Sequence, residues 1–268
     1  MANLKFLITK GRKRLNSNRF NNLPSELLTE ILAKVASTSA IDLFQAKTSC
    51  KDFRLAASDD YVFQNIEIDS FVDKSWKIRQ NGASNFLERC NKCGNPESLF
   101  RQGMIDYFSN LKIDSGFECL KKAANKGHVV ATYVYGIILV CYGGELRKKG
   151  LKLLFELKRR SNSRLIVKEC REKVRKIFYE MWPNINYIIG YGPAEEDEFK
   201  RKLKNCKCKA KLCSWTAVPR KESSVWKPPR DEEFEDDKFS CQACLWDLEA
   251  FRFLNFLRTK CFKVPFLL

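Results

Sequence analysis

A short internal repeat constrains the fold of this 268-residue chain more than any other feature. Residues 99–103 (Leu-Phe-Arg-Gln-Gly) align with residues 132–136 (Thr-Tyr-Val-Tyr-Gly) at an offset of 33, and residues 116–120 align with residues 150–154 at an offset of 34. This period is typical of helix–turn–helix units that stack into a solenoid, because one such unit cannot bury its apolar face alone. The repeat therefore predicts a mainly α fold built around a short α/α solenoid.

Two glycines in the aligned segments predict how the repeat helices meet. Gly103 and Gly136 both fall inside apolar helical patterns, where a glycine costs about 1 kcal/mol relative to alanine. That cost is explained if the partner helix crosses at close range at each glycine. We therefore expect close helix packing at both positions.

The segment between the two units has the composition of a helix end. Residues 120–128 (Leu-Lys-Lys-Ala-Ala-Asn-Lys-Gly-His), followed by Ala131, resemble the tetratricopeptide-like Sel-type repeat. Gly127 fits the left-handed residue that often ends a helix. His128 is the only histidine of the chain, and we interpret it as a packing or capping residue rather than a base or a ligand. A further helix is expected from Arg164 to Met181, ended by Pro183.

An amphipathic helical unit is predicted near the N-terminus. Pro24 suits a helix start, because its missing N–H would be unpaired there in any case. Apolar residues recur at helical spacing through residues 27–35, and residues 37–39 (Ser-Thr-Ser) can cap a second short helix. A third helical segment carries Phe53, so we expect a three-helix unit. A unit of fewer than 50 residues buries only a small core. We therefore expect a neighbour to complete its apolar surface.

The residues of this unit form an ordered series that resembles an F-box. It starts with Leu-Pro-x-Glu-Leu-Leu-x-x-Ile-Leu over residues 23–32, has Leu43 in the middle, and ends with Cys-Lys-x-Phe over residues 50–53. The resemblance implies docking to a Skp-type adaptor and, through it, to a cullin scaffold. The residues expected to face the adaptor are Leu23, Pro24, Leu27, Leu28, Ile31 and Leu43.

The combination is similar to a plant F-box subgroup that carries one or two Sel-type repeats. Its members have an Asn-Pro-Glu-x-Leu-Phe/Tyr entry to the repeats, which here is residues 95–100 (Asn-Pro-Glu-Ser-Leu-Phe). The resemblance implies the substrate-receptor subunit of a Skp–cullin–F-box E3 ubiquitin ligase. The protein target would be held by the helical repeats or by the C-terminal region.

The net charge of +17 is unevenly distributed. Residues 147–178 hold thirteen Lys or Arg against three Glu, whereas residues 22–68 hold four against seven acids. The basic stretch supports an alternative function, a basic zinc-containing nucleic-acid-binding protein with a degenerate F-box. We favour the interpretation that these long side chains solvate the outer face of a helical repeat.

Clustered cysteines predict a metal site in the C-terminal region. Two thiolate pairs some thirty residues apart can hold a tetrahedral zinc ion, and the expected ligands are Cys206, Cys208, Cys241 and Cys244, with Cys213 as a substitute. Unligated thiols are the alternative. Zinc is thus the one cofactor that the sequence suggests.

Further expectations follow from what the sequence lacks. No apolar run approaches the ~20 residues that cross a bilayer, no catalytic motif is present, and we expect neither membrane association nor an enzyme. The expected location is nuclear, cytoplasmic or both. The predicted organisation is a basic tail at 1–21, the F-box at 22–68, a connector at 69–94, Sel-type repeats at 95–160, a helix and linker at 161–194, and a Cys-rich region at 195–268.

Overall fold

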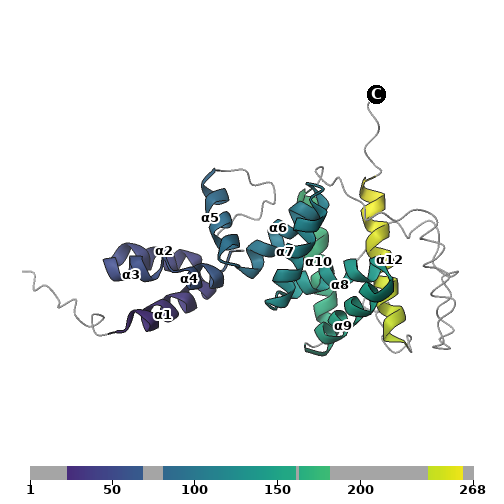
Figure 1. Ribbon diagram of the computed structural model, residues 1–268, viewed down its shortest axis with the longest axis horizontal. Coiled ribbons are helices and arrows are strands. Elements are labelled where there is room, and N and C mark those ends of the chain that lie inside the picture. The colour runs from purple at the N-terminus through teal and green to yellow at the C-terminus, as the bar shows by residue number, and fades with distance from the viewer. Residues whose placement is uncertain (1–22, 69–80, 161–162, 182–240, 262–268) are drawn as a thin grey trace, which may run out of the picture. The chain divides into compact units, whose positions relative to one another are not determined.

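The computed structural model describes residues 23–68, 81–160, 163–181 and 241–261. Every regular element in these ranges is a helix (Figure 1), which confirms the mainly α fold. Contacts between helices divide the chain after Ile66 into two compact units.

The described part of the first unit holds four short helices: α1 (Ser25–Thr38), α2 (Ala40–Ser49), α3 (Lys51–Ala56) and α4 (Asp60–Asn65). Helix α1 packs on α4, and α2 packs on α3. The Ser39 hydroxyl caps α2 by accepting from the Asp42 N–H at 3.1 Å, as the sequence predicted. The sequence analysis expected three helices in this unit. The fourth begins after Asp59, whose carboxylate accepts from the Tyr61 N–H at 2.8 Å.

The predicted repeat is present as two helical pairs in the second unit. Helices α6 (Pro96–Phe108) and α7 (Ile113–Asn125) form the first pair, and α8 (Val129–Tyr142) and α9 (Gly144–Arg160) form the second. These two pairs have the most extensive helix–helix contacts of the described residues. Gly127, with φ of 84°, ends α7, as expected.

Both repeat glycines lie at a close crossing, which confirms the prediction made for them. A Cβ atom at Gly103 would lie 2.8 Å from Leu120 Cγ, and one at Gly136 would lie 2.7 Å from Leu154 Cγ. The facing helices carry their own glycines at the same crossings. A Cβ atom at Gly116 would overlap the Tyr107 backbone, and one at Gly150 would lie 2.6 Å from the Gly136 carbonyl oxygen. Each helical pair is therefore closed through two glycines.

Helix α8 lies at the centre of the second unit. It is apolar on nearly all sides and buries ten of the eleven residues from Val130 to Val140, the exception being Thr132. Such a helix needs neighbours all round. Contacts with α7, α9, α10 (Ser163–Met181) and α12 (Gln242–Cys261) supply them.

Among the described residues of this unit, three more helices flank the repeats. Helix α5 (Asn81–Lys92) lies within the range assigned to a connector, and it packs on α6. Helix α10 matches the helix predicted from Arg164 to Met181, whereas Pro183 lies outside the described residues. Helix α12, in the range assigned to a Cys-rich region, was not predicted.

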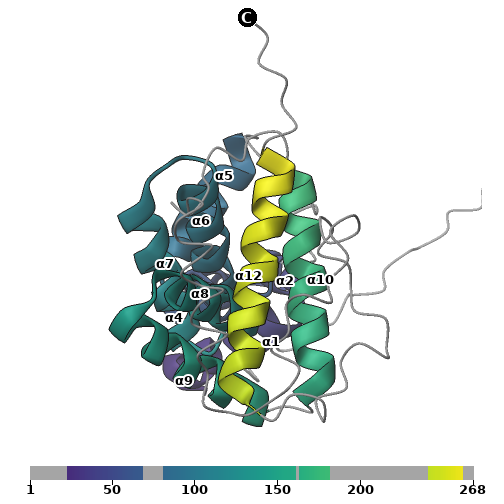
Figure 2. The ribbon, with the colours of Figure 1, turned by 90° about the vertical axis from the view of Figure 1, so that its right-hand side faces the viewer.

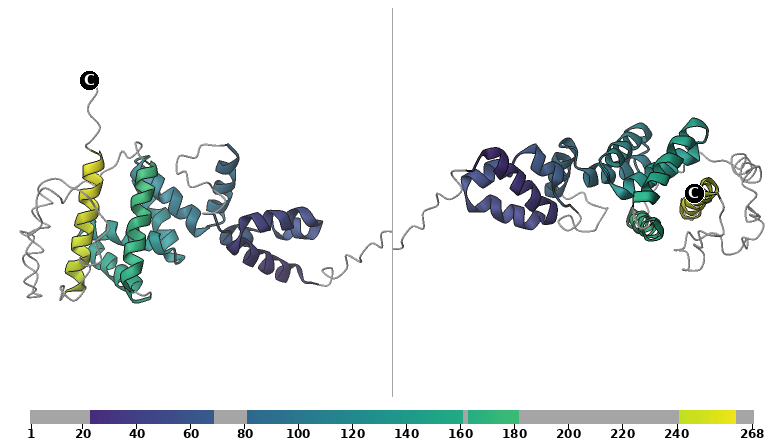
Figure 3. Two further views of the ribbon diagram at one scale, coloured as in Figure 1. Left: turned by 180° about the vertical axis from the view of Figure 1, so that it is seen from behind. Right: turned by 90° about the horizontal axis from the view of Figure 1, so that it is seen from below.

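Helices α10 and α12, the two longest of the described helices, run alongside each other (Figures 2 and 3), and aromatic side chains join them. The Phe178 ring lies 6.0 Å from Phe253 and 5.9 Å from Phe256, measured between ring centroids. Phe108 of α6 meets Phe178 at 4.9 Å. The core of the repeats therefore continues into the C-terminal helix.

Candidate functional site

The predicted adaptor-facing residues divide into an outer and an inner set. Leu27 and Ile31 are 48% and 49% exposed on α1, and Pro24 is exposed at its start. Leu23 is half-buried. Leu27 and Ile31 are four residues apart, so they are neighbours on one helix face. Together they form an apolar surface that the unit does not cover itself.

Leu28 and Leu43, which were also expected to face the adaptor, form the inner set. Their side chains are 6% and 2% exposed, and they belong to the interior of the first unit. Leu28 shares the inner face of α1 with Leu32, and no external surface reaches either side chain. The sequence showed one wide apolar stripe on α1, and spacing alone did not separate its core half from its outer half.

Three further exposed apolar residues of this unit were missed by the sequence analysis. Ile41 of α2, Leu55 of α3 and Tyr61 of α4 are 54%, 74% and 49% exposed. Large apolar side chains at this exposure, on a small unit, favour binding to another protein. Ile41 and Tyr61 belong to short helices that also contribute buried residues, Leu43 on α2 and Val62 on α4.

A buried ion pair joins α12 to α10 in the second unit, and a hydrogen bond joins the same carboxylate to repeat helix α8. Glu249 of α12 accepts hydrogen bonds from the Tyr133 hydroxyl and from the Arg171 guanidinium, with Arg171 Nε 2.9 Å from Glu249 Oε1. Side chains of Arg171 and Glu249 are 1% and 4% exposed. A buried charge is tolerated only when it is paired and hydrogen-bonded, and here both carboxylate oxygens are engaged.

The pKa values in this cluster follow from burial and charge. Burial by itself raises the pKa of Glu249, but the positive charge and hydrogen bonds of Arg171 hold it below the ordinary glutamate value. Burial and the Glu249 charge raise the pKa of Tyr133 well above its ordinary value. The cluster therefore holds an ionised carboxylate beside a neutral phenol.

A second carboxylate attaches α12 to α9. The Arg147 guanidinium meets Asp247 in a two-pronged contact, with Nε–Oδ1 at 2.8 Å and Nη2–Oδ2 at 2.5 Å. Arg147 and Arg171 both belong to the basic stretch 147–178. Part of that basic charge is therefore neutralised within the protein by two acids of α12, which sequence spacing did not reveal.

His128 acts as a cap, as predicted. Its Nδ1 accepts from the Ala131 N–H at 2.9 Å, and its ring stacks on Phe100 with centroids 4.7 Å apart. Its Nε2 lies 2.7 Å from a Glu97 carboxylate oxygen, a partner that the sequence analysis did not identify. Glu97 also pairs with Arg101 at 3.0 Å. These contacts connect α6 with the start of α8.

The predicted zinc ligands are only partly among the described residues. Cys241 lies directly before α12, and Cys244 lies in its first turn with 5% of its surface exposed. Cys206, Cys208 and Cys213 lie outside the described residues. The zinc site stays a prediction.

Comparison with known proteins bears on both units. A family described as plant tetratrico peptide repeats matches residues 69–179. This range contains α5 and α10 as well as the two helical pairs. An F-box protein of Arabidopsis thaliana is 30% identical over 130 residues, which cover 48% of this chain and 78% of that protein. The chain belongs to the F-box protein family.

Two more proteins of Arabidopsis thaliana are similar to this F-box protein. One, provisionally named an F-box protein, is 33% identical over 193 residues, which are 71% of this chain and 62% of the relative. Another F-box protein is 26% identical over 124 residues, which are 46% of this chain and 37% of the relative. The chain thus spans less than two thirds of the length of either. No solved structure matches it.

The sequence analysis found no apolar run long enough to cross a bilayer. Among the residues that the structure describes, no helix combines the length and the apolar character needed to span a bilayer.

Proposed function

We propose that this F-box protein is the substrate-receptor subunit of a Skp–cullin–F-box ubiquitin ligase. The first unit would bind the Skp-type adaptor and, through it, the cullin scaffold, and the second unit would hold a protein target. The role is one of binding and positioning, and we propose no bond-making residue in this chain. Action in the nucleus, the cytoplasm or both accords with this proposal.

The observation that carries the proposal is the apolar surface of α1. Leu27 and Ile31 belong to the F-box series that starts with Leu-Pro, and both side chains are half-exposed. Burying such a side chain completely gives about 1.5–3 kcal/mol. An adaptor that covers both therefore gains a sizeable part of its binding energy from two neighbouring residues.

Co-expression with a Skp-type adaptor tests the proposal. The two chains should co-purify and elute together in gel filtration as a 1:1 complex. Independent elution of two well-folded proteins at micromolar concentration would contradict the proposed role.

The described structure adds no specific support for the nucleic-acid alternative. The basic stretch contributes Arg147 and Arg171 to internal ion pairs with α12. The same stretch also contains Lys148, Lys152 and Arg159 of α9, and these cations lie around an exposed phenylalanine.

A further inference from the structure

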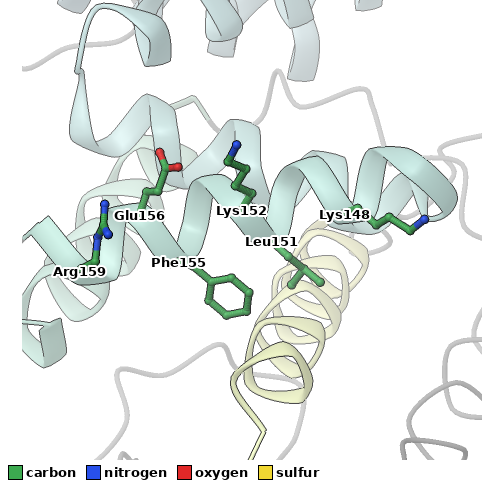
Figure 4. A pocket seen from close by; sticks show the side chains of 6 residues that line it. All are labelled: Lys148, Leu151, Lys152, Phe155, Glu156 and Arg159. Carbon is green, nitrogen blue, oxygen red and sulfur yellow. The ribbon is translucent and has the colours of Figure 1, made fainter.

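Helix α9 presents a mixed basic and apolar stripe on its outer side. Its side chains line an open hollow of about 440 Å³ (Figure 4), and they are Lys148, Leu151, Lys152, Phe155, Glu156 and Arg159. Spacings of three and four residues place them on one face of the helix. We name this set the α9 stripe.

The apolar part of the α9 stripe is unusual for an outer helix face. Phe155 is 36% exposed and lies between basic side chains, while Leu151, 7% exposed, lies beside it toward the core. The opposite face of α9 is already occupied, because Leu154 and Leu157 are buried in the repeat core. Phe155 therefore lies on the face of α9 that is not buried in the repeat core.

The charged part of the α9 stripe is predominantly positive. Lys148, Lys152 and Arg159 are exposed, against one carboxylate, Glu156. Lys148 pairs only with the well-exposed Glu145, at 2.6 Å, and exposed pairs contribute little. Within the described ranges, neither Lys152 nor Arg159 has an ion-pair partner.

Two neighbouring polar residues of α9 do have partners on α12. Arg147 is paired with Asp247, and Lys158 donates to the Gln242 side chain at 3.0 Å. Helix α12 thus engages two polar residues of α9 and leaves the cations of the stripe available. The stripe is a surface separate from the one that holds α12.

We infer that the α9 stripe binds an acidic segment of the target protein that carries an apolar, preferably aromatic, residue. The apolar residue would pack on Phe155, and carboxylates on either side would meet Lys148, Lys152 and Arg159. Arg159 can bind a carboxylate through two hydrogen bonds. This inference rests on the proposed function, because it names the surface and the kind of target segment.

Charge complementarity favours this occupant. The three cations flank one aromatic ring, which fits a carboxylate–apolar–carboxylate sequence of a few residues. A nucleic acid would need an extended basic track for its phosphates, whereas the α9 stripe includes Glu156 among its members. The acidic residues 231–237 of this chain share the chemistry of the inferred partner, and their binding is an alternative that the experiment must separate.

The test measures peptide binding to the full chain in complex with its adaptor. The probe is a fluorescein-labelled peptide with six Asp or Glu residues around one Phe. Two control peptides replace the Phe by Ala or all the acids by their amides. Fluorescence anisotropy at physiological salt gives each dissociation constant, and the unmodified peptide should bind about tenfold or more tightly than either control.

Three variants of the chain place the binding on the α9 stripe. Lys152→Glu with Arg159→Glu should weaken peptide binding about tenfold or more, and Phe155→Ala should weaken it about fivefold or more. The matched control, Lys122→Glu with Lys126→Glu, makes the same charge change at two exposed positions, one in the last turn of α7 and one directly after it, and should alter binding less than about twofold. If the charge-reversal variant melts early, Lys152→Gln with Arg159→Gln replaces it.

Each other outcome overturns the inference in a recognisable way. Equal losses in the stripe variant and the α7 control would show general attraction to a basic protein. Absence of peptide binding would exclude this chemistry. Binding that emerges only after the acids of 231–237 are changed to amides would show that the chain's own segment occupies the stripe. Tighter binding of a single-stranded oligonucleotide with the same variant pattern would assign the stripe to nucleic acid.

Adaptor capture in the same samples separates this inference from the proposed function. Stripe variants should still co-purify with the adaptor, because the substitutions lie outside the F-box. If the unmodified chain captures the adaptor but does not bind the peptide, the inference alone is overturned. Failure of the unmodified chain to capture the adaptor overturns the proposed function, whatever the peptide does.

Discussion

At the scale of single residues, two kinds of position carry the second unit: glycines that permit close crossings, and buried charges that fix α12. Gly103 and Gly116 meet in one helical pair, and Gly136 and Gly150 meet in the other. The pairs differ in what a new Cβ atom would touch. At Gly136 it would meet the flexible end of Leu154, whereas at Gly116 it would meet the Tyr107 backbone.

This difference predicts the effect of alanine at Gly116. Alanine normally stabilises a helix interior by about 1 kcal/mol relative to glycine. We expect Gly116→Ala to destabilise instead, by about 1–3 kcal/mol, because the helix backbones must separate. Urea unfolding measures the change, with Gly136→Ala as the milder comparison. A Gly116→Ala protein as stable as the unmodified chain would contradict the close crossing.

The Glu249 carboxylate predicts a pH dependence of stability. Its folded pKa is lowered from the ordinary value of 4.5, so its contribution is complete above that pH. The contribution is lost as pH falls below 4.5 through the lowered folded pKa. Glu249→Gln should cost about 3–5 kcal/mol near neutral pH, because Arg171 then stays buried without its counter-charge.

Urea unfolding between pH 7 and pH 3 checks this prediction. The unmodified chain should lose stability on acidification more steeply than Glu249→Gln. The exposed Glu169→Gln on α10 is the matched control and should keep the steep dependence. Equal slopes for the unmodified chain and Glu249→Gln would contradict the prediction, because the stability would then not depend on the charge of Glu249.

At the scale of elements, the sequence analysis succeeded where one helix repeats the pattern of another. The alignment at offsets of 33 and 34 located α6 to α9 and both crossings, because spacing in the sequence maps directly onto helix stacking. Ser39 and His128 were identified as caps because a cap acts on its own helix. These features depend on neighbours in the chain.

Helices α5 and α12 show where sequence reasoning falls short. Helix α12 buries Trp246 and Phe253 together with Asp247 and Glu249, so its apolar and charged residues do not separate into two faces. The acids are paired with Arg147 and Arg171, which lie 100 and 78 residues away. No local spacing predicts such pairs. The same reasoning explains Leu28, whose burial depends on the other helices of its unit.

The zinc prediction also belongs to this scale. If Cys206 and Cys208 join Cys241 and Cys244 around one ion, purified protein should contain about one zinc per chain. Cys206→Ser with Cys208→Ser should abolish the metal, whereas Cys119→Ser, in helix α7, should retain it. Elemental analysis by mass spectrometry after exhaustive dialysis is the measurement. Folded, metal-free protein prepared without chelators would contradict the zinc site.

At the scale of the whole molecule, the two units differ in how far they bury their apolar residues. The first exposes apolar residues on each of its described helices, and the described part of the second encloses Trp246 and several Phe and Tyr residues in a continuous core. A small unit with uncovered apolar surface depends on a partner, whereas a unit with a large core is stable without one. This contrast is what the proposed receptor requires.

The affinity for the Skp-type adaptor tests that account most directly. Isothermal titration calorimetry should show Leu27→Ala with Ile31→Ala weakening adaptor binding by about 2–3 kcal/mol, roughly 30–150-fold. Leu146→Ala, a comparably exposed leucine of α9 in the second unit, should leave the affinity unchanged, and both variants should melt as the unmodified chain does. An unchanged affinity in the folded α1 variant would contradict the claim that this helix face binds the adaptor.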